Sequence, residues 1–140
     1  MKQLSVFLEN REGRLEDVLE ILKNRNINIL SLSLADSSEF GVLRMIVSDP
    51  EEGKKALKEK EISVRLTDVL VVRVPHCVGG LQRILVPILH EKMNVEYLYA
   101  LTTTKENAII VLKTSELEKT RAVLQKENIE LISAEMLLDK

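Results

Sequence analysis

Two glycine turns carry most of the groups in this sequence that a small ligand would contact. A glycine turn that leads into a helix leaves backbone N–H groups unpaired, with the positive end of the helix dipole behind them. Such a turn favours a small carboxylate. The candidate ligand-binding residues are, in the first turn, Asn10, Arg11, Glu12, Gly13, Arg14 and Leu15 and, in the second turn, His76, Cys77, Val78, Gly79, Gly80 and Leu81.

Two asparagines extend this prediction, because side-chain amides both donate and accept hydrogen bonds. Asn28 and Asn94 open the strands that follow the two predicted helices. Their amides suit the amino or carboxyl group of an amino acid. The alternative is structural, since such turns are common helix entries. In that case Gly13 only makes the turn and Asn28 only ends the helix.

The second turn raises the alternative of a catalytic role. His76 and Cys77 are neighbours, which raises the alternative of a cysteine nucleophile activated by histidine. Adjacent residues in an extended segment point in opposite directions, so they make a poor pair. No cluster has the spacing of metal ligands, and the turn lacks the length and the Lys-Ser/Thr ending of a phosphate-binding loop. We therefore predict a protein that is not an enzyme and has no metal and no cofactor.

Composition narrows the classes of partner. The chain has 140 residues, a formal net charge of −2 and a pI of about 5.8. Without a basic stripe, nucleic acid and anionic membrane are not expected as partners. Cys77 is the only cysteine, which excludes a disulfide framework. No leader and no long apolar run is apparent, so a cytoplasmic location is the simplest expectation.

The sequence contains an internal repeat with an offset of 66 residues. Gly13 then aligns with Gly79, and Asn28 with Asn94. The apolar positions of the two predicted helices align as well: Leu15 with Leu81, Val18 with Ile84, Leu19 with Leu85 and Leu22 with Ile88. A fixed period of this kind indicates repeated structural units. We predict two modules, residues 1–67 and 68–140.

Each module is predicted to contain the elements β-α-β-β-α-β. Alternation and helical spacing place strands at 1–8, 27–34, 40–48 and 62–66, with helices from Leu15 and after Asp49. The second module is expected to have strands at 70–74, 95–101, 108–113 and 131–136, a helix after Gly80 and a helix capped by Ser115. This order predicts an α+β fold of two tandem ferredoxin-like modules, each an antiparallel four-stranded sheet with two helices on one face.

Pro87 departs from the repeat, because it lies mid-helix where its counterpart is Ile21. Proline has no N–H to donate to the carbonyl of Arg83. We predict a kink there, or a helix that begins later than the repeat implies.

The sheet face away from the helices is predicted to be apolar and therefore to be a partner surface. Leu4, Leu32, Leu43 and Met45 are expected to face the helices. The opposite face is then expected to carry Phe7, Val42, Arg44 and Ile46 in the first module, and Val71, Tyr97, Tyr99, Ile110 and Leu112 in the second. We expect this face to pack within the chain or in a homodimer.

The first turn, its helix and the Asn-Ile-Asn-Ile after it resemble the signature of ACT domains. In that family the pattern is roughly Asn-basic-Pro-Gly-x-Leu before the helix and Gly-Ile/Val-Asn-Ile after it. Glu12 stands where proline is usual, and Asn26 replaces the second glycine. In the second module His76 replaces the asparagine and Val78 the proline. The positions that match are Asn10, Arg11, Gly13, Leu15, Asn28 and Ile29, and later Gly79, Leu81 and Asn94.

The resemblance implies a stand-alone regulatory protein that binds an amino acid. It implies that Asn10 and Asn28 contact the polar backbone groups of the ligand, with the N–H groups of 11–15 nearby. ACT ligands usually lie where two modules meet, so we expect the glycine turns to hold the ligand near the interface between modules. The alternative is a regulatory or structural subunit that docks a biosynthetic enzyme through its sheet face.

Overall fold

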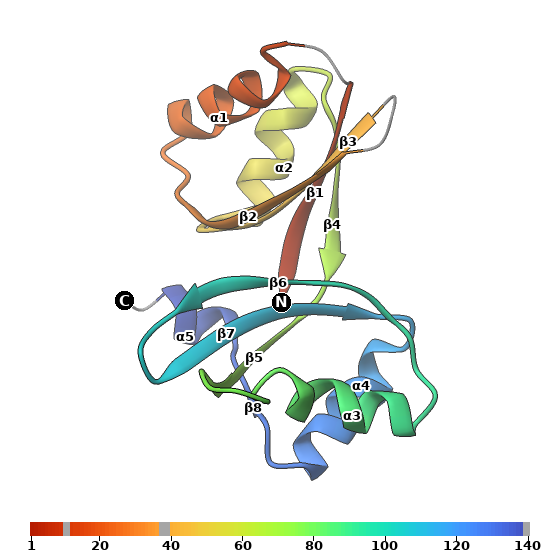
Figure 1. The fold of residues 1–140 in the computed structure, drawn as a ribbon. Coiled ribbons are helices and arrows are strands. Elements are labelled where there is room, and N and C mark those ends of the chain that lie inside the picture. The colour runs from red at the N-terminus through yellow and green to blue at the C-terminus, as the bar shows by residue number, and fades with distance from the viewer. Residues whose placement is uncertain (10–11, 37–39, 139–140) are drawn as a thin grey trace. The chain divides into compact units, whose positions relative to one another are not determined.

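The computed structural model describes residues 1–9, 12–36 and 40–138. The chain forms two compact units, Lys2–Thr67 and Asp68–Lys140 with Met1. Each unit contains a four-stranded sheet and two helices that pack on one sheet face (Figure 1). This confirms the predicted fold class. That each unit is a domain able to fold alone stays a prediction.

The elements follow the predicted order twice. The first six are β1 (Lys2–Glu9), α1 (Arg14–Asn24), β2 (Ile29–Asp36), β3 (Phe40–Val47), α2 (Pro50–Glu59) and β4 (Ser63–Asp68). The others are β5 (Leu70–Pro75), α3 (Gln82–His90), β6 (Val95–Thr103), β7 (Asn107–Thr114), α4 (Leu117–Lys126), β8 (Glu130–Leu131) and α5 (Ala134–Leu138). The strand orders are β2-β3-β1-β4 and β6-β7-β5-β8.

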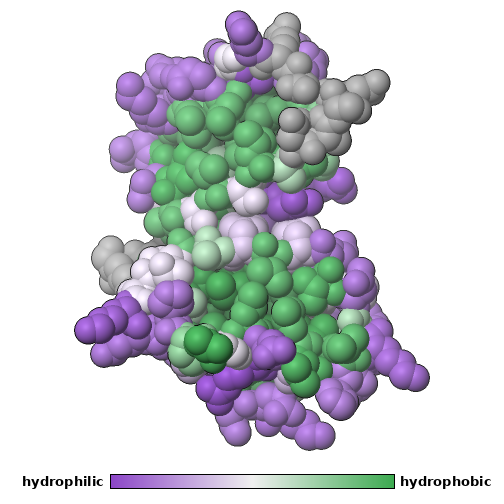
Figure 2. All heavy atoms as spheres, in the orientation of Figure 1, coloured by the Kyte–Doolittle hydropathy of each residue, from purple (hydrophilic) through white to green (hydrophobic). Residues whose placement is uncertain are grey.

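Alternation in the central strands and helical spacing in α1 and α3 build the two cores. In β1, Leu4, Val6 and Leu8 point to the helix layer, where they meet Val18 and Leu22 of α1. Burying a side chain of this size contributes about 1.5–3 kcal/mol. The equivalent core of the second unit includes Leu70, Val72, Val74, Ile84 and Ile88. On the face shown in Figure 2, hydrophobic residues gather in the middle of each unit and hydrophilic residues lie toward its margins.

A polar pair distinguishes the second core from the first. Thr114 and Thr120 are both fully buried, and their hydroxyl groups share a hydrogen bond of 2.6 Å. Gly53 holds the place of Thr120 in the first unit, where an added Cβ would lie 2.9 Å from Cδ1 of Leu4. The first unit therefore packs its helix more closely on the sheet, while the second fills the same space with paired hydroxyls.

All four long helices end in the same way. Asn26, Glu61, Lys92 and Asn128 each follow a helix and each take φ 59°, the left-handed conformation that ends many helices. Asn26 is thus the helix-ending residue at the position where the family signature has glycine, and asparagine tolerates this conformation better than most side chains.

The prediction for the outer sheet face is correct in the first unit and partly wrong in the second. Val72, in the core, pairs with Ile110, and Leu70 pairs with Leu112. Ile110 and Leu112 therefore face the helices, and their neighbours Ile109 and Val111 take the outer face. Tyr97 and Tyr99 do lie on that outer face, because Tyr99 pairs with Val111 and Tyr97 with Lys113.

An inserted residue is the physical reason for this error. Val72 lies 66 residues after Val6, but Ile110 lies 67 residues after the equivalent Leu43. The extra residue is taken up in β6, where the register shifts between Ala100 and Thr102. Because side chains alternate along a strand, one inserted residue reverses which face each later side chain occupies.

Leu32 shows a second limit of the face prediction. It pairs with Met45 and so shares the helix-facing side, but it is 45% exposed. The reason is its place in β2, which is an edge strand of the sheet.

Two predictions near the C-terminus are wrong. The strand expected at 131–136 is only Glu130–Leu131, and α5 follows it. Ser133 accepts a hydrogen bond from the N–H of Met136 at 3.3 Å, so it begins a helix of good helix formers instead. Ser115 does not cap α4 either, because the cap position is Glu116, whose side chain makes no capping bond.

Of the two outcomes expected from Pro87, a kink or a later helix start, the structure shows the later start. The repeat places the start of the helix at Gly80, the counterpart of Arg14, whereas α3 begins at Gln82. Tight turns fill the gap, with the N–H of Gly80 donating to Cys77 O and the N–H of Arg83 donating to Gly80 O.

Within the described ranges, no helix is long and apolar enough to cross a lipid bilayer.

We predict that Asp49→Ala destabilises the protein by about 1 kcal/mol, because Asp49 Oδ1 accepts the N–H of Glu52 at 3.1 Å and caps α2. The matched control is Glu116→Ala at the same place before α4, which removes no capping bond. Urea denaturation of both variants measures the difference. Equal losses in the two variants would contradict the capping role.

Candidate functional site

The two glycine turns have the same backbone conformation. Gly13 has φ 83° and Gly79 has φ 81°, both in the left-handed region that side chains disfavour. Gly13 occupies the cap position of α1, and its carbonyl accepts the N–H of Asp17 at 2.9 Å. No side chain caps the start of α1 or of α3. The start of α3 is closed by backbone turns instead, in which the N–H groups of Arg83 and Ile84 donate to the carbonyls of Gly80 and Leu81.

Arg14 is the most distinctive side chain at the first turn. Its side chain is 22% exposed and lies 3.5 Å from Asp17 in an ion pair. Its Nε is buried without a hydrogen-bond acceptor in the described part of the chain. Burying an unpaired donor is costly, so this atom has an unmet need for an oxygen acceptor.

The other predicted residues of the first turn divide into three groups. Leu15 packs against the first core, so its role is structural. Glu12 and Gly13 are exposed. Asn10 and Arg11 lie outside the described residues.

The second turn is held by backbone bonds and leaves its side chains outside. The N–H of His76 donates to Glu106 O at 2.9 Å, and the N–H of Cys77 donates to Pro75 O. Cys77 is exposed, as is Val78. Among the described residues, the His76 ring and the Cys77 thiol make no hydrogen bond or ion pair, with each other or with anything else. Nothing in this geometry prepares a nucleophile.

Gly80 has a packing reason of its own. A Cβ at this position would overlap the carbonyl oxygen of Pro75, so the turn closes only around glycine. The first unit has Arg14 at the equivalent position. The two turns therefore share a backbone shape but offer different side chains.

The structure separates the asparagines from the turns within each unit. Gly13 precedes α1 and Asn28 follows it, and a helix of 11 residues is about 16 Å long. The strand registers give the same result. Ser5 of β1 and Ser33 of β2 both pair with Arg44 of β3, so β1 and β2 start at the same end of the sheet. A free amino acid is too short to span this distance. Gly13 and Asn28 of one unit therefore do not hold the same ligand.

Asn28 and Asn94 have a shared backbone role. The carbonyl of Asn28 accepts the N–H of Ser48 at 2.9 Å, and the carbonyl of Asn94 accepts the N–H of Ser115 at 3.2 Å. These bonds join the start of β2 or β6 to the residue after the neighbouring strand. The N–H of Asn28 also donates to Ser48 Oγ.

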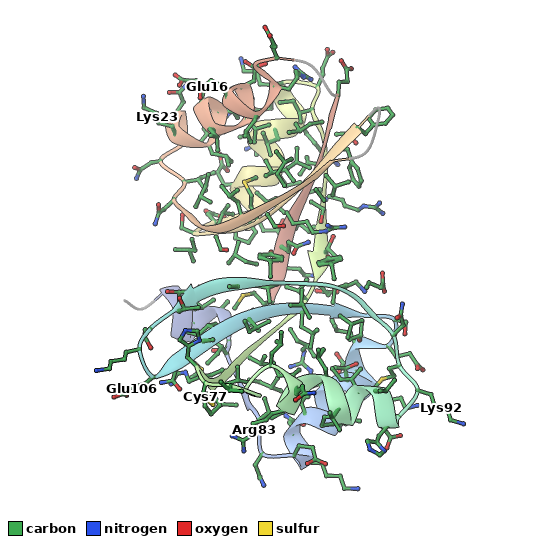
Figure 3. The ribbon with its side chains drawn as sticks, viewed as in Figure 1. Glu16, Lys23, Cys77, Arg83, Lys92 and Glu106 are labelled. Atoms are coloured by element: carbon green, nitrogen blue, oxygen red, sulfur yellow. The ribbon has the colours of Figure 1, made fainter. Side chains whose placement is uncertain are left out.

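A groove of about 400 Å³ lies beside the second turn. Its lining comes from the turn, from one face of α3 and from the residues that follow α4. Figure 3 shows Arg83 of α3 beside the segment that follows α4. The lining residues are Gly79, Gln82, Arg83, Val86, Pro87, Glu127 and Ile129.

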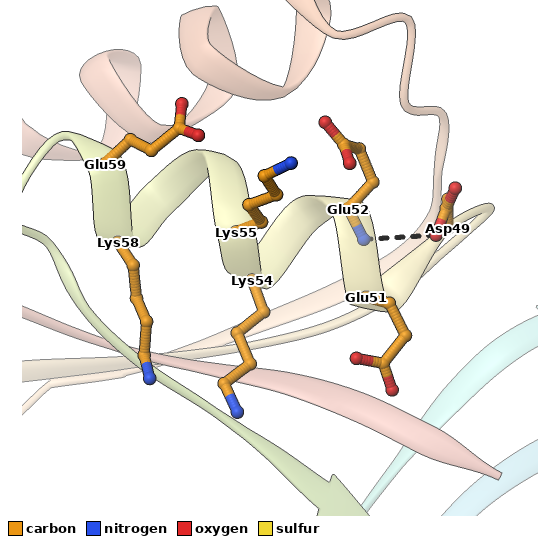
Figure 4. A pocket seen from close by; sticks show the side chains of 7 residues that line it. All are labelled: Asp49, Glu51, Glu52, Lys54, Lys55, Lys58 and Glu59. Atoms are coloured by element: carbon orange, nitrogen blue, oxygen red, sulfur yellow. Dashed lines mark hydrogen bonds between the residues drawn. The ribbon is translucent and has the colours of Figure 1, made fainter.

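A larger depression of about 760 Å³ follows the outer face of α2 (Figure 4). It is lined by carboxylates and lysines of that helix, with no apolar wall. Arg25 donates hydrogen bonds to Glu52, at 2.6 Å, and to Glu59, and these bonds to two carboxylates raise the pKa of Arg25. We regard this surface as a solvated helix face that ties α1 to α2.

No metal centre is apparent in the ranges that the structure describes, where no group of three or more His, Cys, Asp or Glu side chains converges. The geometry instead offers small-molecule binding, through helix N–H groups, one buried guanidinium nitrogen and a groove with both charges.

Comparison with protein families identifies the fold. A model described as "ACT domain pair" matches residues 1–140. The chain belongs to the ACT domain pair family. This confirms the resemblance that the first turn suggested.

Solved structures agree with this assignment. Protein BT0572 from Bacteroides thetaiotaomicron is 38% identical, with a TM-score of 0.92, over 99% of this chain and 96% of that one. The regulatory subunit of aspartate kinase from Thermus thermophilus is 15% identical with a TM-score of 0.67, over 91% of this ACT pair and 89% of that chain. The Thermus flavus regulatory subunit is also 15% identical, with a TM-score of 0.64, over 91% and 90%. At 15% identity the likeness concerns the fold. No match was found among the curated proteins.

Sequence reasoning missed the groove residues of the second unit. Gln82, Arg83 and Val86 lie on α3, and Glu127 lies 44 residues after Arg83. Pro87 was the available signal, because it breaks the repeat and also lines the groove. The remaining lining residues come together only because α3 packs beside the end of α4, and the sequence does not reveal this packing.

We predict that Gly13→Ala and Gly80→Ala differ in kind. An added Cβ at Gly13 meets nothing within 4 Å, so Gly13→Ala costs only the left-handed strain, about 1–2 kcal/mol. Gly80→Ala collides with backbone and must move the turn. Amide NMR spectra will show changes limited to the residues around Gly13 in the first variant and displacement of residues 75–83 in the second. Similar local changes in both would contradict the packing role of Gly80.

Proposed function

We propose that this ACT domain pair protein is a non-catalytic regulator that binds a free amino acid at its glycine turns. The observation that carries the proposal is the left-handed glycine before an uncapped helix, present in both units. Together with membership of the ACT family, it favours a carboxylate ligand over the purely structural role of the turn.

The buried Nε of Arg14 supports a ligand at the first turn. A guanidinium nitrogen without an acceptor gains a charge-assisted hydrogen bond when a carboxylate arrives. Asn10 and Arg11, which match the family signature, are proposed to contact the same ligand. Asn28 and Asn94 lie at the other ends of their helices, so they are proposed to contact a ligand held by a different turn.

Regulation follows from linkage between binding and conformation. A ligand shifts an equilibrium only by its differential affinity for the two states. A free ligand concentration of a hundred times Kd stabilises the binding-competent form by about 2.7 kcal/mol. This is a sizeable fraction of the stability of a small protein. The aspartate kinase proteins of the same fold are described as regulatory subunits, and this supports a regulatory role here. The position of the ligand near the interface between modules stays a prediction.

We predict that a thermal-shift screen against the twenty amino acids at millimolar concentration gives at least one clear rise in Tm. Arg14→Gln is then expected to weaken binding at the first turn by about tenfold, the equivalent of about 1.4 kcal/mol for one charge-assisted bond. Asn10→Ala should act in the same direction.

Arg121→Gln is the matched control for Arg14→Gln. Arg121 also forms an i,i+3 ion pair, with Glu118 at 3.4 Å, but it lies on α4 and belongs to neither glycine turn. Its removal should leave ligand affinity unchanged. If no amino acid raises Tm, the amino-acid proposal is wrong. If affinity is unchanged in Arg14→Gln and Asn10→Ala, the ligand does not bind at the first turn.

A second candidate function is a subunit that docks a biosynthetic enzyme. The observation that favours it is two large apolar side chains exposed on β2, the edge strand of the first sheet. Leu32 and Leu34 are 45% and 49% exposed.

We predict for this candidate that Leu34→Lys abolishes copurification of a single stoichiometric enzyme while leaving Tm within a degree or two. Lys23→Leu, on an exposed face of α1, is the control that changes hydrophobicity elsewhere. Retention of the same enzyme by Leu34→Lys would rule out docking through this edge.

A further inference from the structure

The groove of the second unit combines charge and apolar surface in a way that fits a whole amino acid. We propose that this groove, between α3 and the end of α4, holds a zwitterionic amino acid with an apolar side chain. This inference rests on the proposed function, because it names the site and the ligand class in the second unit.

Arg83 and Glu127 supply the two charges that a zwitterion requires. Both line the groove and both are exposed. Within the described residues neither has an ion-pair partner, whereas other charges of the same unit are paired, including Arg73 with Glu130 and Arg121 with Glu118. Arg83 thus offers a guanidinium to the carboxylate of the ligand, and Glu127 a carboxylate to its ammonium group.

The helix start reinforces the carboxylate end of the groove. Gly79 and Gln82 line it at the point where α3 begins. The first turn of α3 contains no acidic residue, whereas the first turn of α1 contains Glu16 and Asp17. The positive end of the α3 dipole is therefore not offset by neighbouring carboxylates.

Three apolar residues line the groove together with the two charges. They are Val86, Pro87 and Ile129, and Val86 is 46% exposed. An apolar side chain of a ligand would cover this surface. The volume of about 400 Å³ lies within the usual range of small-molecule sites.

The first unit lacks the same combination. In the repeat, Glu20 takes the place of Val86, Asp17 that of Arg83 and Lys60 that of Glu127. Asp17 is already paired with Arg14. The equivalent surface of the first unit therefore has no cation in place of Arg83 and no apolar side chain in place of Val86.

Pro87 acquires a role in this arrangement. Its counterpart Ile21 has an N–H, but Pro87 has none to give to the carbonyl of Arg83. Arg83 and Pro87 both line the groove, and the Arg83 carbonyl has lost its usual donor. The ammonium group of a ligand is a suitable replacement donor.

L-Leucine is the probe, with two analogues that each lack one charge. Leucinamide has no carboxylate, and 4-methyl-2-oxopentanoate has no ammonium group. Binding is measured by chemical-shift titration of the ¹⁵N-labelled full chain. We expect leucine to bind at least tenfold more tightly than either analogue and to shift the amides of residues 79–86 and 127–129.

Charge-removing variants separate the two contacts. Arg83→Gln should weaken leucine about tenfold but leave leucinamide unchanged, because the amide never used the guanidinium. Glu127→Gln should weaken leucine while leaving the oxo acid unchanged. Val86→Glu, which copies the first unit, should weaken leucine and the oxo acid, because both carry a carboxylate.

Lys60→Gln, at the position of the first unit equivalent to Glu127, is the matched control and should change none of these affinities. The spectra of all variants also report whether the fold is intact.

The outcomes distinguish this inference from the proposed function. If another amino acid raises Tm but leucine leaves residues 79–86 unshifted, the groove assignment is wrong and the proposed function stands. Shifts at these residues that are insensitive to Arg83→Gln and Glu127→Gln would also overturn the assignment. If no amino acid binds anywhere, both proposals fail.

Discussion

The chain can enter α1 and α3 where it does only because Gly13 and Gly79 take left-handed backbone angles. This single constraint reverses the chain after β1 and β5 and lays an apolar helix stripe over the sheet it has just left. Neither helix has a capping side chain, because the cap position is Gly13 in α1 and the apolar Leu81 in α3. The fold and the candidate binding chemistry therefore depend on the same backbone feature.

The two units share their special backbone conformations but differ in many side chains. Left-handed residues recur after each of the four long helices at φ 59°, although they are two asparagines, a glutamate and a lysine. In the core, Gly53 of one unit becomes Thr120 of the other, and the added hydroxyl finds Thr114 as its partner. On the surface, Arg14 gives way to Gly80, because the second turn closes against Pro75. The two units thus share one fold but carry different side chains at their turns.

Energetics are consistent with a protein whose units respond to a small ligand. A module of about 65 residues buries only about 60% of the surface that its unfolded chain exposes, so its stability is modest. A few kcal/mol from ligand binding is then a large fraction of the total. The exposed Arg83 and Glu127 contribute little to folding as long as they face water, which leaves them available for a partner molecule.

The sequence by itself determined the fold class, the repeat and the two glycine turns. Alternation at Leu4, Val6 and Leu8 and helical spacing at Val18 and Leu22 are local patterns, and each was enough to place its element against a core. Such patterns fail where one residue is inserted, as the bulge in β6 reversed the faces assigned to Ile110 and Leu112.

Only the tertiary structure decided how these residues combine. It showed that Gly13 and Asn28 stand at opposite ends of α1, although both belong to one signature. It also brought Arg83 and Glu127, far apart in the sequence, to one groove. The physical reason is that helix length and helix packing set distances between residues, and neither is written in the local spacing of side chains.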